Sequence, residues 1–277
     1  MTSAHSGDGQ SSSTRAHFVM VPLLAQGHTI PMTDMARLLA ERGAQVSFIT
    51  TPGNASRLAG FAANVKEAGL AEPLMAYLRE QQLQRSPPSC IISDMINWWT
   101  ADIARELGIP RLAFIGFCAF SSLIRHLTFH TNVFEHVKDE NELVTITAFP
   151  TPLELTKAKS PGSLSIPGAE KIHDKILEEA LRCDGEVINS FEELEALYIE
   201  SFEQVTGKKA WTIGPMCLCH RNNNTMAVRG NKASMDESHC LQWLDSMKPV
   251  SVVFVSFGSL ACTTPQQLVE LGLGLEA

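Results

Sequence analysis

Residues 17–50 read HFVMVPLLAQGHTIPMTDMARLLAERGAQVSFIT and place two strand-like runs on either side of one helical run. His17–Leu24 is a short apolar run rich in Val and Phe, which is typical of a buried strand. Apolar side chains then recur at helical spacing from Met32 to Leu39, Gly43 ends the helix, and Gln45–Thr50 is a second strand-like run. This strand–helix–strand order predicts a parallel sheet covered by helices.

The same alternation continues along the chain. Five further strand-like runs are expected, most of them separated by helical stretches: Cys90–Ser93, Arg111–Ile115, Glu186–Ile188, Trp211–Ile213 and Val250–Ser256. Residues 138–168 hold four prolines and are expected to be mostly irregular. Residues 220–238 are polar and typical of a linker. A strand and a helix are expected after this linker. The sequence therefore predicts an α/β fold.

The composition limits the class of protein. The chain has 277 residues, of which 44% are hydrophobic and 19% charged, so it can bury a sizeable core. Its net charge of −8 argues against a basic nucleic-acid-binding surface. No apolar run approaches the roughly 20 residues of a membrane-spanning helix, and no secretory signal is visible. We expect a cytoplasmic chain with no nucleic-acid partner, no membrane insertion and a disordered tail over residues 1–16.

The seven cysteines are scattered and are expected to be reduced thiols. Cys217, Cys219 and His220 lie close together, with His239 and Cys240 downstream. Because this spacing matches no common zinc pattern, we expect no metal site.

His28 and Asp94 are the first candidates for chemistry. Each follows a predicted strand, and the carboxyl ends of parallel strands meet at the edge where open α/β sheets hold their ligands. A histidine suits general-base catalysis at neutral pH, and a carboxylate can hold one tautomer and stabilise the imidazolium. Taken singly, each residue has a structural alternative, a turn histidine for His28 and a helix N-cap for Asp94.

Gly258 and Ser259 follow the predicted strand Val250–Ser256 and precede a helix. Backbone N–H groups and the Ser259 hydroxyl could there meet an anionic phosphate, although a plain strand–turn–helix link explains the same residues. No G-x-G-x-x-G follows a strand, and neither a phosphate-loop motif nor G-x-S-x-G is present. Dehydrogenases, phosphate-loop NTPases and nucleophile-elbow hydrolases are therefore poor fits.

Five stretches together resemble the plant UDP-dependent glycosyltransferases of the inverting, GT-B-fold type. They are HFVMVPLLAQGHTIPMTDMARLLAERG (17–43), CIISDMINWWTADIARELGIPRLAF (90–114), INSFEELE (188–195), WTIGPM (211–216) and CLQWLDSMKPVSVVFVSFGSL (240–260). The resemblance implies a Rossmann-like parallel sheet flanked by helices, the N-terminal half of a GT-B fold, plus the first βα unit of the second domain. Residues 17–216 would bind the acceptor, 217–239 would link, and 240–277 would begin the donor-binding domain.

The same resemblance implies the chemistry. His28 would remove a proton from the acceptor hydroxyl, Asp94 would pair with it, and the oxygen would displace UDP from the sugar with inversion. Gly258 and Ser259 would contact the UDP-sugar donor, which is a co-substrate and needs no metal or other cofactor. The acceptor would be a small hydroxylated metabolite such as a flavonoid, terpenoid or hormone. It would lie in a pocket formed by Gly27, Trp98, Trp99, Phe117 and Phe120.

Three departures from the family pattern bear on activity. A threonine found near Gly116 in some members is missing. Between Gly69 and Ala71 one expected helical stretch runs into another, where relatives carry a further strand and a long acceptor-pocket segment. The chain stops at Ala277, before the donor box that starts W-A-P-Q and centres on H-C-G-W-N-S. We expect a truncated chain with impaired transfer of a sugar, glucose by resemblance; the alternative is a non-catalytic acceptor-binding or interaction protein.

Overall fold

The computed structural model describes residues 15–51, 65–67, 71–84, 87–160, 170–180, 182–219, 236–257 and 263–276. The chain divides into two compact units, Met1–Asn223 and Asn224–Ala277. Most of the expected tail, residues 1–14, lies outside the described residues.

The first unit is built on a parallel sheet with seven described strands in the order β3-β2-β1-β4-β5-β8-β9. The strands are β1 His17–Val21, β2 Gln45–Thr50, β3 Val65–Glu67, β4 Cys90–Asp94, β5 Arg111–Ile115, β8 Gly185–Ile188 and β9 Lys209–Thr212. The helices of this unit are α1 Gln26–Glu41, α3 Ala71–Gln82, α4 Thr100–Leu107, α5 Ala119–His130, α6 Glu170–Ala180 and α7 Glu192–Thr206. The α/β fold expected from the sequence is confirmed.

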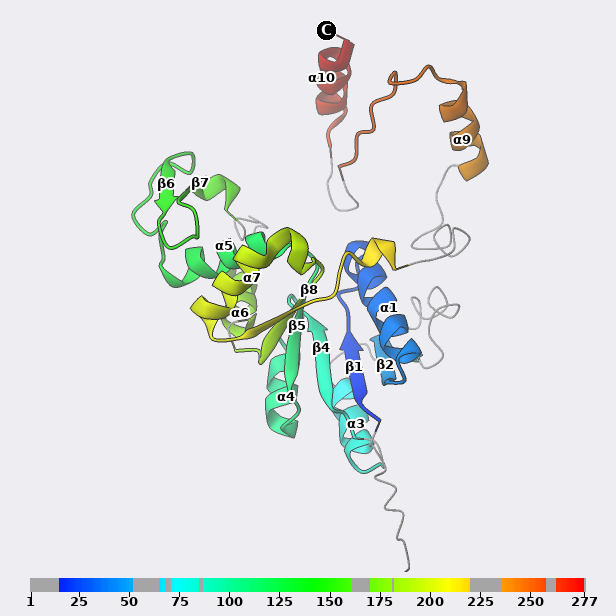
Figure 1. The fold of residues 1–277 in the computed structure, drawn as a ribbon, viewed down its shortest axis with the longest axis vertical. Coiled ribbons are helices and arrows are strands. Elements are labelled where there is room, and N and C mark those ends of the chain that lie inside the picture. Colours follow the sequence, from blue (N-terminus) through cyan, green and yellow to red (C-terminus); the bar gives the residue numbers. More distant parts are fainter. Residues whose placement is uncertain are drawn as a thin grey trace, which may run out of the picture. The chain divides into compact units, whose positions relative to one another are not determined.

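The order of the strands reverses next to β1. The chain leaves β1 through α1 to β2 on one side, and β4 pairs with β1 on the other side. In Figure 1 the arrowheads of β1, β4 and β5 point to the same edge of the sheet. The carboxyl ends of β1 and β4 therefore flank the switch point of the sheet, where α/β proteins of this kind bind their ligands.

Both faces of the sheet are covered, and the alternation of side chains along the strands decides which residue faces which helix. Met20 of β1 and Phe114 of β5 pack with Met32 of α1 on one face. On the other face, Val19 packs with α3 and α4, and Ile115 packs with α5 and α7. Other buried side chains divide in the same way: the first face also holds Met35, Phe48 and Ile92, and the second holds Leu74, Ile91, Ile103, Leu123 and Phe202.

Helix α4 ends at a glycine. Gly108 has φ 62° and ψ 31°, the left-handed conformation that a residue with a Cβ rarely adopts. Its backbone N–H points back to the carbonyl groups of Ala104 and Arg105. The chain is thereby turned into β5, whose first residue is Arg111.

The structure refines one expectation about the first unit and overturns another. Residues 138–168 are expected to be mostly irregular, and within their described part β6 Leu143–Ile146 and β7 Leu153–Thr156 form an antiparallel pair. Pairing of the backbone outweighs the local proline signal there, because the prolines at 150 and 152 lie in the connection between the strands. Residues 65–67 were included in an expected helix, but they form β3 at the edge of the sheet, parallel to β2. A further strand is thus present where the sequence suggested its loss.

The second unit is described over two stretches, residues 236–257 and 263–276. Helix α9 Glu237–Ser246 begins after Asp236, whose side chain accepts a hydrogen bond from the Ser238 N–H at 2.8 Å. Helix α10 Pro265–Glu276 begins with a capping box, in which Thr264 and Gln267 exchange hydrogen bonds.

The strand expected at Val250–Ser256 is not formed, which corrects the sequence prediction. Residues 251–257 have no regular secondary structure, and Phe254 is 90% exposed. A strand needs a neighbour for its backbone hydrogen bonds, and no described strand pairs with this segment.

Candidate functional site

A histidine and an aspartate meet at the switch point of the sheet. His28 lies in the first turn of α1, directly after β1, and Asp94 is the last residue of β4. Nδ1 of His28 lies 2.6 Å from Oδ2 of Asp94. The Asp94 side chain is 1% exposed, whereas the His28 side chain is 29% exposed. The carboxylate is therefore sealed behind an imidazole that solvent and ligands can reach.

This contact defines the state of the imidazole. A carboxylate only accepts hydrogen bonds, so in neutral His28 the proton is on Nδ1 and Nε2 keeps its lone pair. The hydrogen bond to Asp94, together with the charge of that carboxylate, raises the pKa of His28 above its ordinary value, although burial acts in the opposite direction. The pair can accept a proton at Nε2 and stabilise the imidazolium that results.

Backbone groups after β4 hold the carboxylate in place. The Ile96 N–H donates to Oδ1 of Asp94 at 3.0 Å, so both carboxylate oxygens are engaged. The Asn97 amide donates to the carbonyl oxygen of Val21 at 3.0 Å and ties this turn to the end of β1. Asp94 therefore is not the N-cap of α4, which is Trp99, without a side-chain cap.

Asn97 was missed by the sequence reasoning. Its signal is an amide three residues after Asp94, in the turn that leaves the strand. The position of its side chain against β1 depends on the pairing of β1 with β4, which a local pattern does not contain.

Gly27 immediately precedes His28 in the first turn of α1. A Cβ built at this position would meet no heavy atom within 4 Å. The space is open on the side of the helix where this Cβ would lie, so the glycine is not required by packing within the described residues.

The four aromatic residues expected to line one pocket make separate contacts. Phe120 packs edge-to-face against Phe149 and Tyr198, with ring centroids 5.1 Å apart in both pairs. Phe117 is 38% exposed, and the Arg125 guanidinium lies 6.0 Å from its ring.

The two tryptophans also make separate contacts. Trp99 packs against the core cluster beneath α3 and α4. Trp98 has the Lys175 ammonium 4.7 Å from its ring. None of these recorded contacts joins two of the four aromatic side chains, and a shared acceptor pocket stays a prediction.

The remaining predicted site residues can be placed briefly. Gly258 and Ser259 lie outside the described residues, so their expected contact with the donor stays a prediction. Among the residues that the structure describes, no group of three or more His, Cys, Asp or Glu could hold a metal ion. In the same part of the chain, no helix is both long and apolar enough to span a membrane.

Solved structures with a similar fold define the class of protein. The crystal structure of Glycyrrhiza uralensis UGT73P12, complexed with glycyrrhetinic acid 3-O-monoglucuronide, superposes with a TM-score of 0.76. It is 26% identical, and the match covers 95% of this chain and 61% of that one. Phytolacca americana UGT2, complexed with UDP-2fluoro-glucose and pterostilbene, has the same fold with a TM-score of 0.69 at 22% identity, over 94% of this chain and 64% of that one. The fold is that of the GT-B glycosyltransferases.

Sequence comparison narrows the class to a family. UDP-glycosyltransferase 73E1 of Stevia rebaudiana is 39% identical over 308 residues, which cover 95% of this chain and 62% of the relative. UDP-glycosyltransferase 73D1 of Arabidopsis thaliana is 36% identical, over 96% of this chain and 61% of the relative. The chain belongs to the plant UDP-glycosyltransferases by this homology. No protein-family model matches it.

The chain spans about three fifths of the length of these curated relatives. The match to the Stevia protein extends over 308 residues, whereas the whole chain has 277. At least 31 positions of that alignment therefore have no counterpart in this chain.

Proposed function

We propose that the protein transfers a sugar from a UDP-sugar to a hydroxyl group of a small plant metabolite, with inversion at the anomeric carbon. The proposed sugar is glucose. The observation that carries this proposal is the buried Asp94 carboxylate, 2.6 Å from the partly exposed imidazole of His28 at the switch point of the sheet. Homology to plant UDP-glycosyltransferases supports the reaction class.

In the proposed reaction His28 is the general base. Nε2 removes the proton of the acceptor hydroxyl while its oxygen bonds to the anomeric carbon of the sugar. The bond from that carbon to the UDP oxygen breaks in the same step, and UDP leaves with the electron pair. Asp94 stabilises the imidazolium as the proton arrives. Holding the hydroxyl and the sugar together contributes about 7–11 kcal/mol in favourable intramolecular cases.

The proposal also assigns a role to each part of the chain. Residues 17–216 bind the acceptor, residues 217–239 link, and residues 240–277 begin the part that binds the donor. The boundary between the two compact units, at Asn223 and Asn224, supports a linker there. Gly258 and Ser259 are assigned to donor contacts by family resemblance alone.

The acceptor class is proposed from the neighbours. The Glycyrrhiza protein was crystallised with glycyrrhetinic acid 3-O-monoglucuronide and the Phytolacca protein with pterostilbene. With these two complexes as support, we propose a small plant metabolite with a hydroxyl group, such as a flavonoid, a terpenoid or a hormone, as acceptor. The donor needs no metal in this proposal, and the cytoplasmic location expected from the sequence stays a prediction.

A transfer assay tests the proposal. The protein is incubated with UDP-glucose and a panel of flavonol, triterpenoid and hormone acceptors, and products are identified by mass spectrometry. We expect a glucoside that disappears with His28→Ala, and a loss of about 10²–10⁴-fold in kcat, which is the usual contribution of a general base. The control variant Asp139→Asn replaces a carboxylate in an exposed turn and should leave the rate unchanged.

The same experiment separates the alternative function. Equal product formation by wild type and His28→Ala would show that His28 is not the general base. Quenching of tryptophan fluorescence by an acceptor, with neither a UDP response nor product, would instead identify a non-catalytic acceptor-binding protein.

A further inference from the structure

Glu195 of α7 is a buried carboxylate that the proposed reaction does not use. The residue is 5% exposed and lies where the backbone of α7 departs from helical values, with φ −130° and ψ 19°. Its two carboxylate oxygens accept hydrogen bonds from the backbone N–H groups of Ala119 at 2.8 Å and Phe120 at 3.0 Å. These are the first two residues of α5, so Glu195 caps a helix other than its own.

This cap supplies acceptors that α5 lacks locally. The first N–H groups of a helix have no partner within the helix, and the N-cap residue, Cys118, offers them no side-chain hydrogen bond. A carboxylate satisfies these donors and interacts favourably with the positive end of the helix dipole. Because buried N–H groups without an acceptor are costly, the conformation at the start of α5 depends on Glu195.

A second contact from α7 holds the same turn of α5. Tyr198 lies three residues after Glu195 and packs edge-to-face on the ring of Phe120, with the ring centroids 5.1 Å apart. Phe120 is therefore held at its backbone by Glu195 and at its side chain by Tyr198.

The first turn of α5 lies close to the His28–Asp94 pair. Residues 116–118 alone separate it from the end of β5. Strand β5 is the neighbour of β4, with Phe114 opposite Asp94, and the Met95 N–H donates to the Phe114 carbonyl oxygen at 3.2 Å. Met95 also packs against the core cluster to which the first turn of α5 belongs. The segment 116–118 thus leaves the sheet at the edge that carries Asp94.

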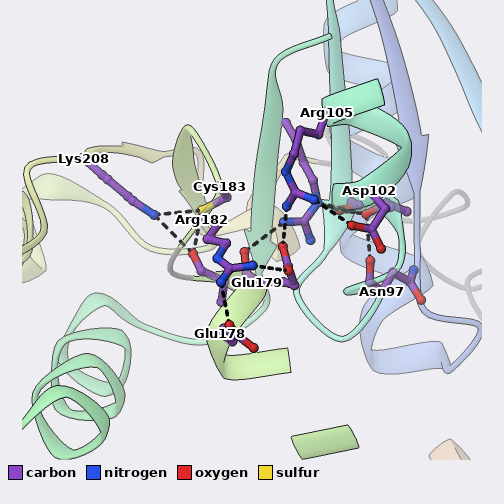
Figure 2. A network of polar contacts seen from close by, with 12 residues as sticks. Asn97, Asp102, Arg105, Glu178, Glu179, Arg182, Cys183 and Lys208 are labelled. Atoms are coloured by element: carbon purple, nitrogen blue, oxygen red, sulfur yellow. Dashed lines mark hydrogen bonds and ion pairs between the residues drawn. The ribbon is translucent and has the colours of Figure 1, made fainter. Parts of the chain in front are cut away.

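A polar network around Glu179 lies at the opposite edge of the sheet. Figure 2 shows Arg105 and Arg182 reaching Glu179 from two sides, at 3.0 and 3.1 Å. Arg111, the first residue of β5, donates from Nη1 to the Glu179 carbonyl oxygen at 3.4 Å. Loss of the Glu179 carboxylate should therefore weaken the fold away from His28.

We propose that Glu195 is a positioning residue for the sugar transfer: its carboxylate fixes residues 116–118 beside the His28–Asp94 pair, where they contact the acceptor. This inference rests on the proposed function. Phe117 is 38% exposed in that segment, so its ring can meet an apolar acceptor. A segment that is held in place before binding loses less conformational entropy when the ligand arrives. Glu195 should therefore act on acceptor binding and not on proton transfer.

Steady-state kinetics of Glu195→Gln tests the proposal, with UDP-glucose and the flavonol or triterpenoid that gives the most product. Glutamine keeps the size of the side chain but has one carbonyl oxygen, so one of the two N–H groups loses its acceptor. We expect the acceptor KM to rise about tenfold, the usual value of a hydrogen bond to a charged group. The kcat should stay within about twofold, because a loss that is equal in ground state and transition state changes KM alone.

Two glutamates provide controls. Glu179→Gln tests for lost stability at the other edge of the sheet. Glu203, also in α7, accepts from the Ala210 N–H of β9 at 2.9 Å, so Glu203→Gln removes a similar contact to a backbone N–H. Both variants should leave the acceptor KM unchanged. Tyr198→Leu removes the ring contact alone and should raise KM about threefold, and it decides the question if Glu195→Gln does not fold.

An acceptor KM that is equal in wild type and Glu195→Gln, or that rises equally in Glu179→Gln, overturns the proposal. A fall in kcat at constant KM also overturns it. A wild type that forms no product refutes the transfer reaction instead, and Glu195 is then tested on acceptor binding, measured by tryptophan fluorescence. The acceptor Kd should rise about tenfold in Glu195→Gln and stay constant in both controls. An unchanged Kd, or no quenching in any variant, overturns the positioning role.

Discussion

His28 and Asp94 are 66 residues apart in the chain, and their side chains are joined by a contact of 2.6 Å. The contact exists because β1 and β4 are neighbours in the sheet, so the turn after β1 and the end of β4 meet at one edge. One partner is buried and the other reaches the surface. Because of this difference in exposure, the buried Asp94 carboxylate can stabilise a proton that His28 takes from a ligand, although Asp94 itself does not contact the ligand.

Asp94→Asn should lower the pKa of His28. The hydrogen bond to the Asp94 carboxylate is the largest cause of the raised pKa, and an amide carries no charge to stabilise the imidazolium. An NMR titration of the His28 ring protons measures the change, with Asp139→Asn as the control. An unchanged pKa in Asp94→Asn would mean that the two side chains are not paired in solution.

The same pair predicts how stability depends on pH. Because folding raises the pKa of His28, the contribution of the pair is fully present below the pKa of the unfolded chain, near 6.5. It is lost as the pH rises through the higher, folded pKa. The difference in the free energy of unfolding between wild type and Asp94→Asn should therefore be larger at pH 5.5 than at pH 9. Urea denaturation at both pH values measures it, and an equal or reversed difference would contradict the assignment.

Gly27→Ala should separate stability from ligand binding. The new Cβ would meet no heavy atom within 4 Å, and alanine is favoured over glycine in a helix by up to about 1 kcal/mol. We expect unchanged or slightly higher stability. If an acceptor approaches His28 over this position, the acceptor KM should rise in the same variant. A fall in Tm would show that Gly27 is needed for packing.

Glu186→Gln should destabilise the first unit strongly. The Glu186 carboxylate accepts from Arg125 Nη2 at 2.7 Å and from the Ser122 hydroxyl at 2.5 Å, and both charged side chains are less than 10% exposed. Leaving Arg125 buried without its carboxylate should cost about 3–5 kcal/mol in urea denaturation.

Glu106→Gln is the matched control for this change, because Glu106 pairs with Arg79 on the surface. It should cost at most about 1 kcal/mol. The double variant Arg125→Met/Glu186→Leu should recover most of the loss, since it removes both buried charges. Equal losses in Glu186→Gln and Glu106→Gln would show that burial does not set the value of the Arg125–Glu186 pair.

Gly185→Ala should also destabilise the sheet. An added Cβ would lie 2.7 Å from the Lys209 carbonyl oxygen and would overlap the Trp211 ring, both on the neighbouring strand β9. Such overpacking typically costs about 1–3 kcal/mol. Gly116→Ala is the control, because its Cβ would make an ordinary contact of 3.8 Å with Phe114. Thermal unfolding compares the two, and equal Tm values would contradict the expected clash.

Much of the fold could be predicted because its signals are local. The apolar runs of β1 and β2, the helical spacing of α1 and the glycine that ends α4 are written in consecutive residues. The paired strands β6 and β7 were missed. The two strands pair with each other across a short connection, and the prolines in that connection concealed them.

Part of the candidate site could likewise be predicted from the sequence, and part could not. Positions after strands pointed to His28 and Asp94, since every parallel strand ends at the same edge. Family resemblance assigns Trp99 and Phe120 to one acceptor pocket, which stays a prediction; in the structure each packs against its own core cluster. Which face a side chain takes depends on helix rotation and on the neighbouring elements.

The order of residues alone thus determined the α/β class, the direction of the strands and the two residue types placed at their carboxyl ends. Only the tertiary structure decided that Asp94 is buried behind His28, and that Arg125 and Glu186 form a buried ion pair. Periodicity and turn chemistry act between near neighbours in the chain. Burial, hydrogen-bond partners and pKa depend on segments that meet only when β1, β4, β5 and β8 pair.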